Sequence, residues 1–220
     1  MLLRLSQIVS IVFHPLFILF YLLVIMMHVN PYLFTAQGFK EQVFLIVSIF
    51  VISVLFPAVS IFMMKMVGFV DTLQMRDAKE RIGPLIATSI FYLWLFINVK
   101  HIDLVPPQYQ VFVLGSVIGL FAAFFLNNFT KISLHGIGIG GFIAALLMIR
   151  YQFPNHHLRF SVMDTHIAIG NDLLLIIGVL ISGFVLFARL YLKAHNKQDV
   201  YGGFLVGFAA QLIALRFIEF

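Results

Sequence analysis

Arg189, His195 and Asp199 are the residues of this chain whose types and spacing most clearly suggest chemistry, in the pattern Arg-x5-His-x3-Asp. Residues four apart on a helix share one face, so the spacing predicts that His195 and Asp199 touch. A carboxylate beside an imidazole fixes the tautomer of the ring and stabilises the cation formed during reaction. Arg189 offers a planar fork of donors for phosphate oxygens. A basic helix end that meets lipid head groups is the alternative interpretation.

A second segment, Lys131-Ile-Ser-Leu-His-Gly136, stands in front of a glycine-rich apolar run. The backbone N–H groups and the dipole of a helix start favour anions, so Gly136 opens a potential phosphate site. Ser133 could donate to the same anion, and His135 is placed to exchange a proton. A single histidine at a helix start is usually an interfacial residue, but its company with the first group favours a functional role.

A third segment, from Arg76 to Pro84, carries three cations within six residues: Arg76, Lys79 and Arg81. Such a group could hold a phosphate. An interfacial segment whose long basic side chains extend into water would have the same composition. For any one of the three cations, the sequence leaves both interpretations open.

Together the three segments resemble the motifs of the type 2 phosphatidic acid phosphatase superfamily (PAP2), a family of integral membrane lipid phosphatases. Its motifs are Lys-x6-Arg-Pro, Pro-Ser-Gly-His and Ser-Arg-x5-His-x3-Asp, and the resemblance spans residues 76–199. The third motif is in register, with Ala188 in place of the serine. In the second motif, Ile132 and Leu134 replace the proline and the glycine. In the first, Arg76 takes the lysine position, Pro84 is present, and Gly83 stands where the family has arginine.

The resemblance implies a metal-independent hydrolysis without a cofactor. His195 would attack phosphorus and form a phosphohistidine, Asp199 would orient it, and His135 would protonate the leaving oxygen and then activate water. The implied ligands of the phosphate are Arg189, Ser133, Gly136, Arg76, Lys79 and Arg81. The implied substrate is a lipid phosphate or diphosphate, such as an isoprenoid diphosphate, phosphatidate or phosphatidylglycerol phosphate. Two alternatives stay open: a non-catalytic lipid-binding or transport protein, and a lipid phosphotransferase that uses the same histidine chemistry.

The composition indicates the setting of these residues. Of the 220 residues, 62% are hydrophobic and 10% are charged, whereas a soluble domain is nearer half apolar and a quarter charged. There is no cysteine, which excludes disulfides and thiolate-bound metal. The net charge of +5 gives no case for nucleic acid, so the expected partners are membrane lipids and a lipid phosphate. The oligomeric state is left open.

The apolar runs predict an all-α, polytopic transmembrane bundle that forms a single membrane domain over residues 1–220. Three polar segments, 67–84, 128–136 and 189–200, are separated by two crossings each, so they should meet on one face of the membrane. The seven candidate spans are 8–29, 43–66, 84–99, 109–127, 136–150, 172–193 and 200–218.

The side of the membrane is only weakly indicated. Basic residues favour the motif face as the cytoplasmic one, but four of them are the proposed phosphate ligands. Without these four, both faces carry equal numbers of basic residues. By resemblance, we expect a bacterial inner membrane protein whose site opens on the outer side.

Two further groups of polar residues have less specific interpretations. His14, before Pro15, could be functional because polar groups are costly within membranes, but a position near the interface or a bond to a neighbouring helix is favoured. The loop opposite the motifs offers metal-ligand types without a specific spacing, and a solvated loop is favoured there. Its candidate ligands are His156, His157, Asp164, His166 and Asp172.

Overall fold

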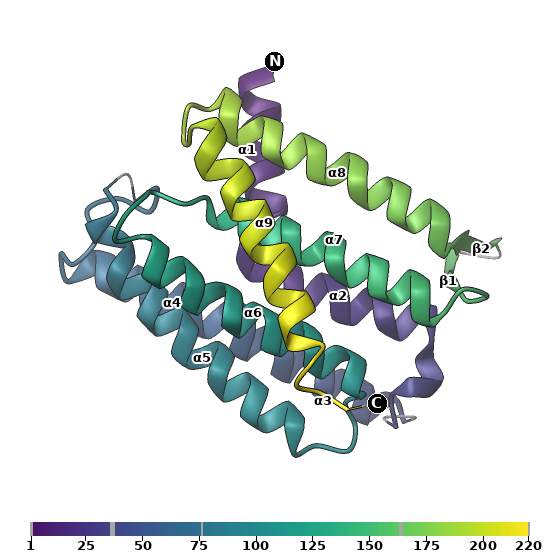
Figure 1. The fold of residues 1–220 in the computed structure, drawn as a ribbon. Coiled ribbons are helices and arrows are strands. Elements are labelled where there is room, and N and C mark those ends of the chain that lie inside the picture. Colours follow the sequence, from purple (N-terminus) through teal and green to yellow (C-terminus); the bar gives the residue numbers. More distant parts are fainter. Residues whose placement is uncertain (1, 36–37, 76, 163–164, 220) are drawn as a thin grey trace.

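The computed structural model, shown in Figure 1, is a bundle of helices with one small β-hairpin. It describes residues 2–35, 38–75, 77–162 and 165–219, with side chains except at 160–162 and 165–166. The long helices lie side by side, and α9 crosses the bundle in contact with α6 and α7. The helices are α1 Leu2–Val12, α2 Pro15–Val29, α3 Phe39–Phe50, α4 Phe56–Met66, α5 Ile82–Lys100, α6 Pro107–Leu126, α7 Leu134–Gln152, α8 Asn171–Tyr191 and α9 Lys197–Ala214.

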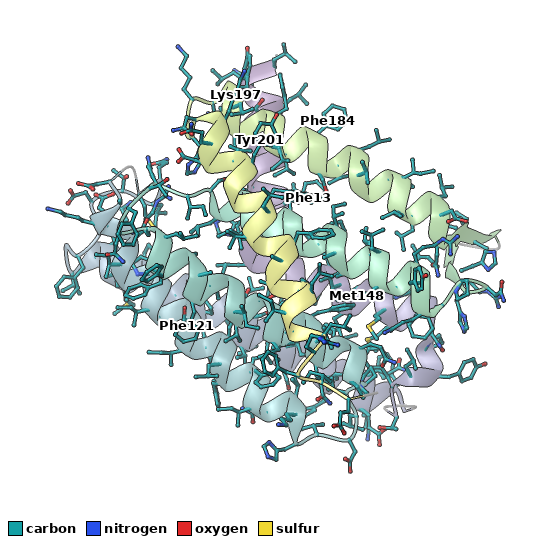
Figure 2. All side chains as sticks on the ribbon, viewed as in Figure 1. Phe13, Phe121, Met148, Phe184, Lys197 and Tyr201 are labelled. Atoms are coloured by element: carbon teal, nitrogen blue, oxygen red, sulfur yellow. The ribbon has the colours of Figure 1, made fainter. Side chains whose placement is uncertain are left out.

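The prediction of a helical, multi-pass membrane protein is confirmed at this level. Five helical runs are long and apolar enough to cross a bilayer, and the bent pair α1–α2 would make a sixth. Figure 2 shows Phe121 and Phe184 on the outside of α6 and α8, where 50% and 65% of their surfaces are exposed. Such faces suit a lipid environment. The five runs are 39–66, 79–100, 107–126, 134–152 and 171–191.

The seventh predicted span, 200–218, corresponds to α9. This helix begins at Lys197 and ends at Ala214 and is not among the described helices that are long and apolar enough to be candidate spans, so its crossing of the membrane stays a prediction. Its first turn contains Lys197 and Asp199, and its last turns contain the buried Gln211. These polar residues lower the hydropathy of α9, which packs on α6 and α7 with one side and exposes Tyr201, Leu205 and Leu212 on the other.

The first predicted span, 8–29, is not one straight helix. α1 and α2 meet at 64° because Pro15 has no N–H and restricts the residue before it to extended backbone. His14 accordingly has ψ 139° and caps α2 with its own ring. The second span is continuous, since a π-helical turn at Val51–Leu55 joins α3 to α4 just before Pro57.

The segment between α7 and α8 was expected to be a loop in an all-α fold, and this expectation is wrong. Strands β1 (His157–Val162) and β2 (Thr165–Gly170) pair as an antiparallel hairpin, with His157 opposite Gly170 and Val162 opposite Thr165. The alternation in Leu158-Arg-Phe-Ser-Val and His166-Ile-Ala-Ile is the two-residue period of a strand. This signal was available in the sequence.

The closest helix contact in the bundle joins α7 to α9 and depends on glycine. A Cβ atom at Gly207 would collide with the carbonyl of Ile137, and one at Gly140 with the carbonyl of Phe204. At Gly136, a Cβ atom would lie 2.7 Å from the carbonyl of Val200. Small residues allow membrane helices to approach to backbone contact. The glycines at 136 and 140 therefore serve packing, and they hold the start of α7 against the start of α9.

This contact predicts opposite effects for two glycines of α9. Gly207→Ala should lower the free energy of unfolding by on the order of 1–3 kcal/mol, as overpacking does. Gly202→Ala, where an added Cβ meets nothing within 4 Å, should be neutral or slightly stabilising because alanine favours helix. Thermal unfolding in one detergent compares them. Equal melting temperatures for the two variants would show that α7 and α9 do not pack in this way.

Candidate functional site

The three polar loops meet at one end of the bundle, as the crossing count predicted. Asn127 Nδ2 donates to the carbonyl of Ala78 at 2.7 Å, which joins the first loop to the second. Thr130 Oγ1 donates to Asp199 Oδ1 at 2.9 Å, and the backbone N–H of Ser133 donates to the carbonyl of Asp199 at 3.1 Å. These bonds join the second loop to the start of α9.

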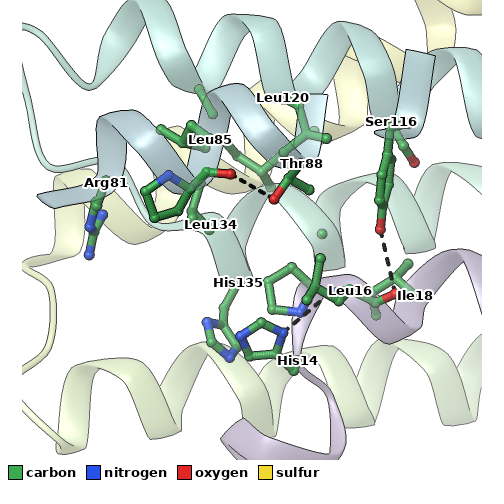
Figure 3. Close-up of a pocket in the computed structure, with 18 of the residues that line it drawn as sticks. His14, Leu16, Ile18, Arg81, Leu85, Thr88, Ser116, Leu120, Leu134 and His135 are labelled. Atoms are coloured by element: carbon green, nitrogen blue, oxygen red, sulfur yellow. Dashed lines mark hydrogen bonds between the residues drawn. The ribbon is translucent and has the colours of Figure 1, made fainter. Parts of the chain in front are cut away.

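A cavity of about 570 Å³ extends from these loops between the helices. Its polar residues at the loop end are Ser10, His14, Gln74, Arg81, His135, Arg189 and His195. Figure 3 shows the rings of His14 and His135 next to each other, with Arg81 on one side and Ser116 on the other. The rest of the cavity wall is mainly apolar and includes Ile18, Leu22, Leu85, Leu120 and Ile137. From Arg81 to Tyr92 along α5, the lining covers about 16 Å at the rise of a helix.

His195 is held by a backbone carbonyl. Its Nδ1 lies 3.0 Å from the carbonyl oxygen of Lys131. A carbonyl only accepts, so this contact places the proton on Nδ1 and the lone pair on Nε2. The side chain is almost buried and the residue lines the cavity. His195 thus has the tautomer that a nucleophilic Nε2 requires.

The charge state of His195 suits the same role. Burial lowers its pKa to about 4, and the positive charges of Arg81 and Arg189 act in the same direction. The Lys131 carbonyl and the Asp199 carboxylate oppose this shift without cancelling it. His195 is therefore neutral at pH 7, and its Nε2 lone pair is available.

Asp199 does not make the direct hydrogen bond to His195 that the sequence suggested. Its Oδ2 lies 3.8 Å from His195 Nδ1, which is too long for a hydrogen bond. The two residues do not share a helix, because Asn196 and Asp199 form the capping box that begins α9, and His195 precedes it. Asp199 accepts from Thr130 Oγ1 and from the N–H of Asn196 at 3.2 Å. It ties the loops together and places its negative charge beside His195.

Ser133 and Gly136 lie behind the cavity. Ser133 is fully buried and caps α7 by accepting from the N–H of Gly136 at 3.2 Å. Neither residue lines the cavity, although Leu134 and His135 do. The structure therefore brings the start of α7 to the site, but it uses Ser133 and Gly136 to build that helix start.

Among the three cations of the first segment, the structure places Arg81 in the cavity wall. Its Nε donates to the carbonyl of Met75 at 3.2 Å, and its Nη1 donates to the carbonyl of Ile132 at 2.9 Å. These bonds use two of the five guanidinium donors and join the first loop to the second. Lys79 is exposed and is not part of the cavity wall. Arg76 lies outside the described residues.

Arg81 and Arg189 have no carboxylate partner in the cavity. No aspartate or glutamate is among the described residues that line it. The charges of the two arginines repel each other, and the carboxylate of Asp199 attracts Arg81 from outside the cavity wall. Within the described chain, no group accepts from the buried Nε of Arg189. A buried charge without a partner is strongly unfavourable. The loop end of the cavity is thus complementary to an anion.

His135 is oriented by the break between α1 and α2. In a continuous helix, the N–H of His14 would donate to the carbonyl of Ser10. Pro15 cannot donate to Ile11, and the N–H of His14 takes that carbonyl instead, at 3.2 Å. The freed carbonyl of Ser10 accepts from His135 Nε2 at 2.9 Å. This fixes the proton of His135 on Nε2 and leaves Nδ1 as an acceptor.

His14 is the site residue that the sequence interpretation underrated. Its ring lies edge-to-face on that of His135, with centroids 5.4 Å apart, and its Nδ1 accepts from the N–H of Leu16 at 3.4 Å. The available signal was the pair His14-Pro15 inside an otherwise apolar run. Proline there frees backbone carbonyls, and a polar residue beside it can serve as a cap.

The sequence also offered possible metal ligands at and beside the hairpin: His156, His157, Asp164, His166 and Asp172. Asp172 forms an ion pair with Arg150. In the described part of the chain, no three histidine, aspartate or glutamate side chains come together as metal ligands would. Asp164 and the side chain of His166 lie outside the described residues.

Comparison with known proteins finds no matching family model, no similar curated protein and no similar solved structure. The functional interpretation therefore rests on the geometry of the cavity and on the motifs.

The environment of His195 predicts an unusual titration. With its pKa at about 4 in the folded chain and about 6.5 when unfolded, the ring should stay neutral when the pH falls from 7 to 5. The unfolded chain then binds the additional proton, so stability that is present above pH 6.5 is lost as the pH falls toward 4.

NMR of histidine-labelled protein, with the His195 signal assigned by loss in His195→Asn, would measure this. A histidine-containing model peptide in the same buffer provides the reference, with a midpoint near 6.5. A His195 midpoint close to that of the model peptide would contradict the buried, cation-flanked environment.

Proposed function

We propose that this chain is a membrane phosphatase that hydrolyses a lipid phosphate or diphosphate through a phosphohistidine on His195. One observation carries the proposal: Arg81, Arg189 and the neutral His195 meet at one end of a cavity whose remaining wall is mainly apolar. Two cations without a carboxylate suit phosphate oxygens. The long apolar wall suits a hydrocarbon chain. The type of reaction is inferred from the resemblance of the motifs to those of PAP2.

The cavity wall includes side chains that are also exposed on the outside of the bundle. Ile11 of α1, Phe62 of α4 and Leu73 of the following loop line the cavity, and each is more than half exposed. These residues give the cavity an apolar opening toward the surroundings of α1 and α4. A lipid could keep its chain in the bilayer while its phosphate reaches the arginines.

In the first chemical step, Nε2 of His195 attacks phosphorus and the bond from phosphorus to the lipid oxygen breaks. The carbonyl of Lys131 holds the Nδ1 proton, so the ring becomes positively charged as it is phosphorylated. Nδ1 of His135, an acceptor in the free site, first takes the proton of the bound phosphate monoanion, and His135 then passes this proton to the leaving oxygen, which departs as an alcohol or a monophosphate. Arg81 and Arg189 stabilise the charge on the phosphoryl oxygens.

In the second step, water attacks phosphorus and His135 takes its proton. The phosphorus–nitrogen bond breaks, its electron pair returns to Nε2 of His195, and inorganic phosphate leaves. A covalent intermediate divides one difficult displacement into two easier ones. Asp199 supports both steps from a distance, since its charge favours the cationic ring and its bonds hold the loops.

From the resemblance to PAP2, we place the protein in a bacterial inner membrane with the site on the outer side.

Phosphate release in the presence of a chelator tests this proposal, with phosphatidate, an isoprenoid diphosphate and phosphatidylglycerol phosphate as substrates. His195→Ala should lower kcat by at least about a thousandfold, as loss of a nucleophile does. Arg81→Gln and Arg189→Gln should each lower kcat/KM by roughly a hundredfold.

Lys193→Gln is the matched control, because Lys193 lies between Arg189 and His195 but is exposed and absent from the cavity wall. It should keep its activity. Tight lipid binding without phosphate release by folded protein would favour the lipid-binding alternative. Transfer of phosphate to an added alcohol in preference to water would favour the phosphotransferase.

A further inference from the structure

The far part of the cavity contains a polar side chain that the proposed chemistry does not use. Gln211 of α9 is 2% exposed and lines the cavity. Its Nε2 donates to the carbonyl of Phe112 at 3.3 Å, and Ser116 Oγ donates to the same carbonyl at 2.9 Å. A carbonyl accepts only, so the nitrogen of the amide must face Phe112.

The oxygen of this amide is left without a donor. Oε1 of Gln211 is buried, and no group in the described part of the chain donates to it. A buried acceptor without a donor destabilises a protein more than an apolar residue of the same size would. Its position calls for a partner that is not part of the protein chain.

The fold makes room for this side chain. An added Cβ at Gly115 of α6 would collide with the Gln211 amide, and one at Gly141 of α7 would lie 3.4 Å from Nε2. Both glycines line the cavity beside Gln211. Two neighbouring helices thus form a slot around one amide, within a mainly apolar wall.

The distance from the phosphate end can be measured along α7. His135 and Gly141 are six residues apart, which corresponds to about 9 Å of helix. We infer that Gln211 accepts a hydrogen bond from a hydroxyl group carried on the chain of the ligand, about 9 Å from its phosphate. This inference rests on the proposed function and narrows the substrate to a hydroxylated lipid phosphate. A plain hydrocarbon or an ester offers no donor at this depth.

The test is binding of two series of phosphonates to the unaltered protein in nanodiscs, measured by calorimetry. Phosphonates are used because their phosphorus–carbon bond is not hydrolysed. One series consists of n-alkylphosphonates, and the other carries a terminal hydroxyl at increasing chain length. At one chain length, the hydroxylated compound should bind about tenfold more tightly than its unsubstituted counterpart, as one buried hydrogen bond can provide.

Gln211→Leu should abolish this preference while it retains binding of the unsubstituted series. Ser89→Ala is the matched control, because Ser89 is also buried without a partner for its hydroxyl but is not part of the cavity wall; it should keep the preference. Equal affinity of both series at every length, or a preference that survives Gln211→Leu, would overturn the inference. The comparison of ligands on the unaltered chain stands even if a variant fails to fold.

The result of this binding test can be distinguished from a failure of the proposed phosphatase activity. A hydroxyl preference lost in Gln211→Leu, in a protein that releases no phosphate, would support the inference and contradict the phosphatase. Phosphate release without any hydroxyl preference would do the reverse.

Discussion

The arrangement of the site follows from one electrostatic constraint: two arginine side chains carry their charge into a cavity without a carboxylate. Arg81 is 6% exposed, and its guanidinium is held by backbone carbonyls of two loops. Carbonyl dipoles can orient a cation, but they do not neutralise it. Asp199, the nearest acidic group to His195, is bound to Thr130 and Asn196 instead. An anion in the cavity would offset the charges of the two arginines.

The helices that position these groups depend on two backbone features. Glycines at the α7–α9 contact bring the start of α7 against the start of α9, so His135 and His195 reach the same cavity. Pro15 interrupts the first membrane helix, and the freed carbonyl of Ser10 then binds His135. A second freed carbonyl, that of Val12, accepts from the hydroxyl of Tyr21 at 2.7 Å. Two carbonyls released by the bend, those of Ser10 and Val12, thus accept from side-chain donors, in keeping with the need of backbone groups for partners.

Much of this arrangement is encoded in local sequence signals. Hydrophobic run length predicted the helical membrane bundle, and counting crossings predicted that residues around 81, 131 and 195 would meet. Spacing alone could not predict that His195 would bind the carbonyl of Lys131 instead of Asp199, because that choice depends on where α9 begins. Run length also predicted a span at 200–218, but α9 carries Asp199 and Gln211 and is not among the candidate spans of the described chain. The place of His14 in the site depends on its ring contact with His135 of α7, which no local pattern records.

The central claim is that His195 becomes covalently phosphorylated, and trapping that intermediate tests it most directly. Purified protein would be mixed with a lipid phosphate, quenched in alkali within a turnover, digested and examined by mass spectrometry, because phosphohistidine survives alkali and is lost in acid. We predict an acid-labile phosphoryl group on the peptide that contains His195 and none on the peptide that contains His135. Turnover with no phosphoryl group on His195, or with one on another residue, would contradict the account.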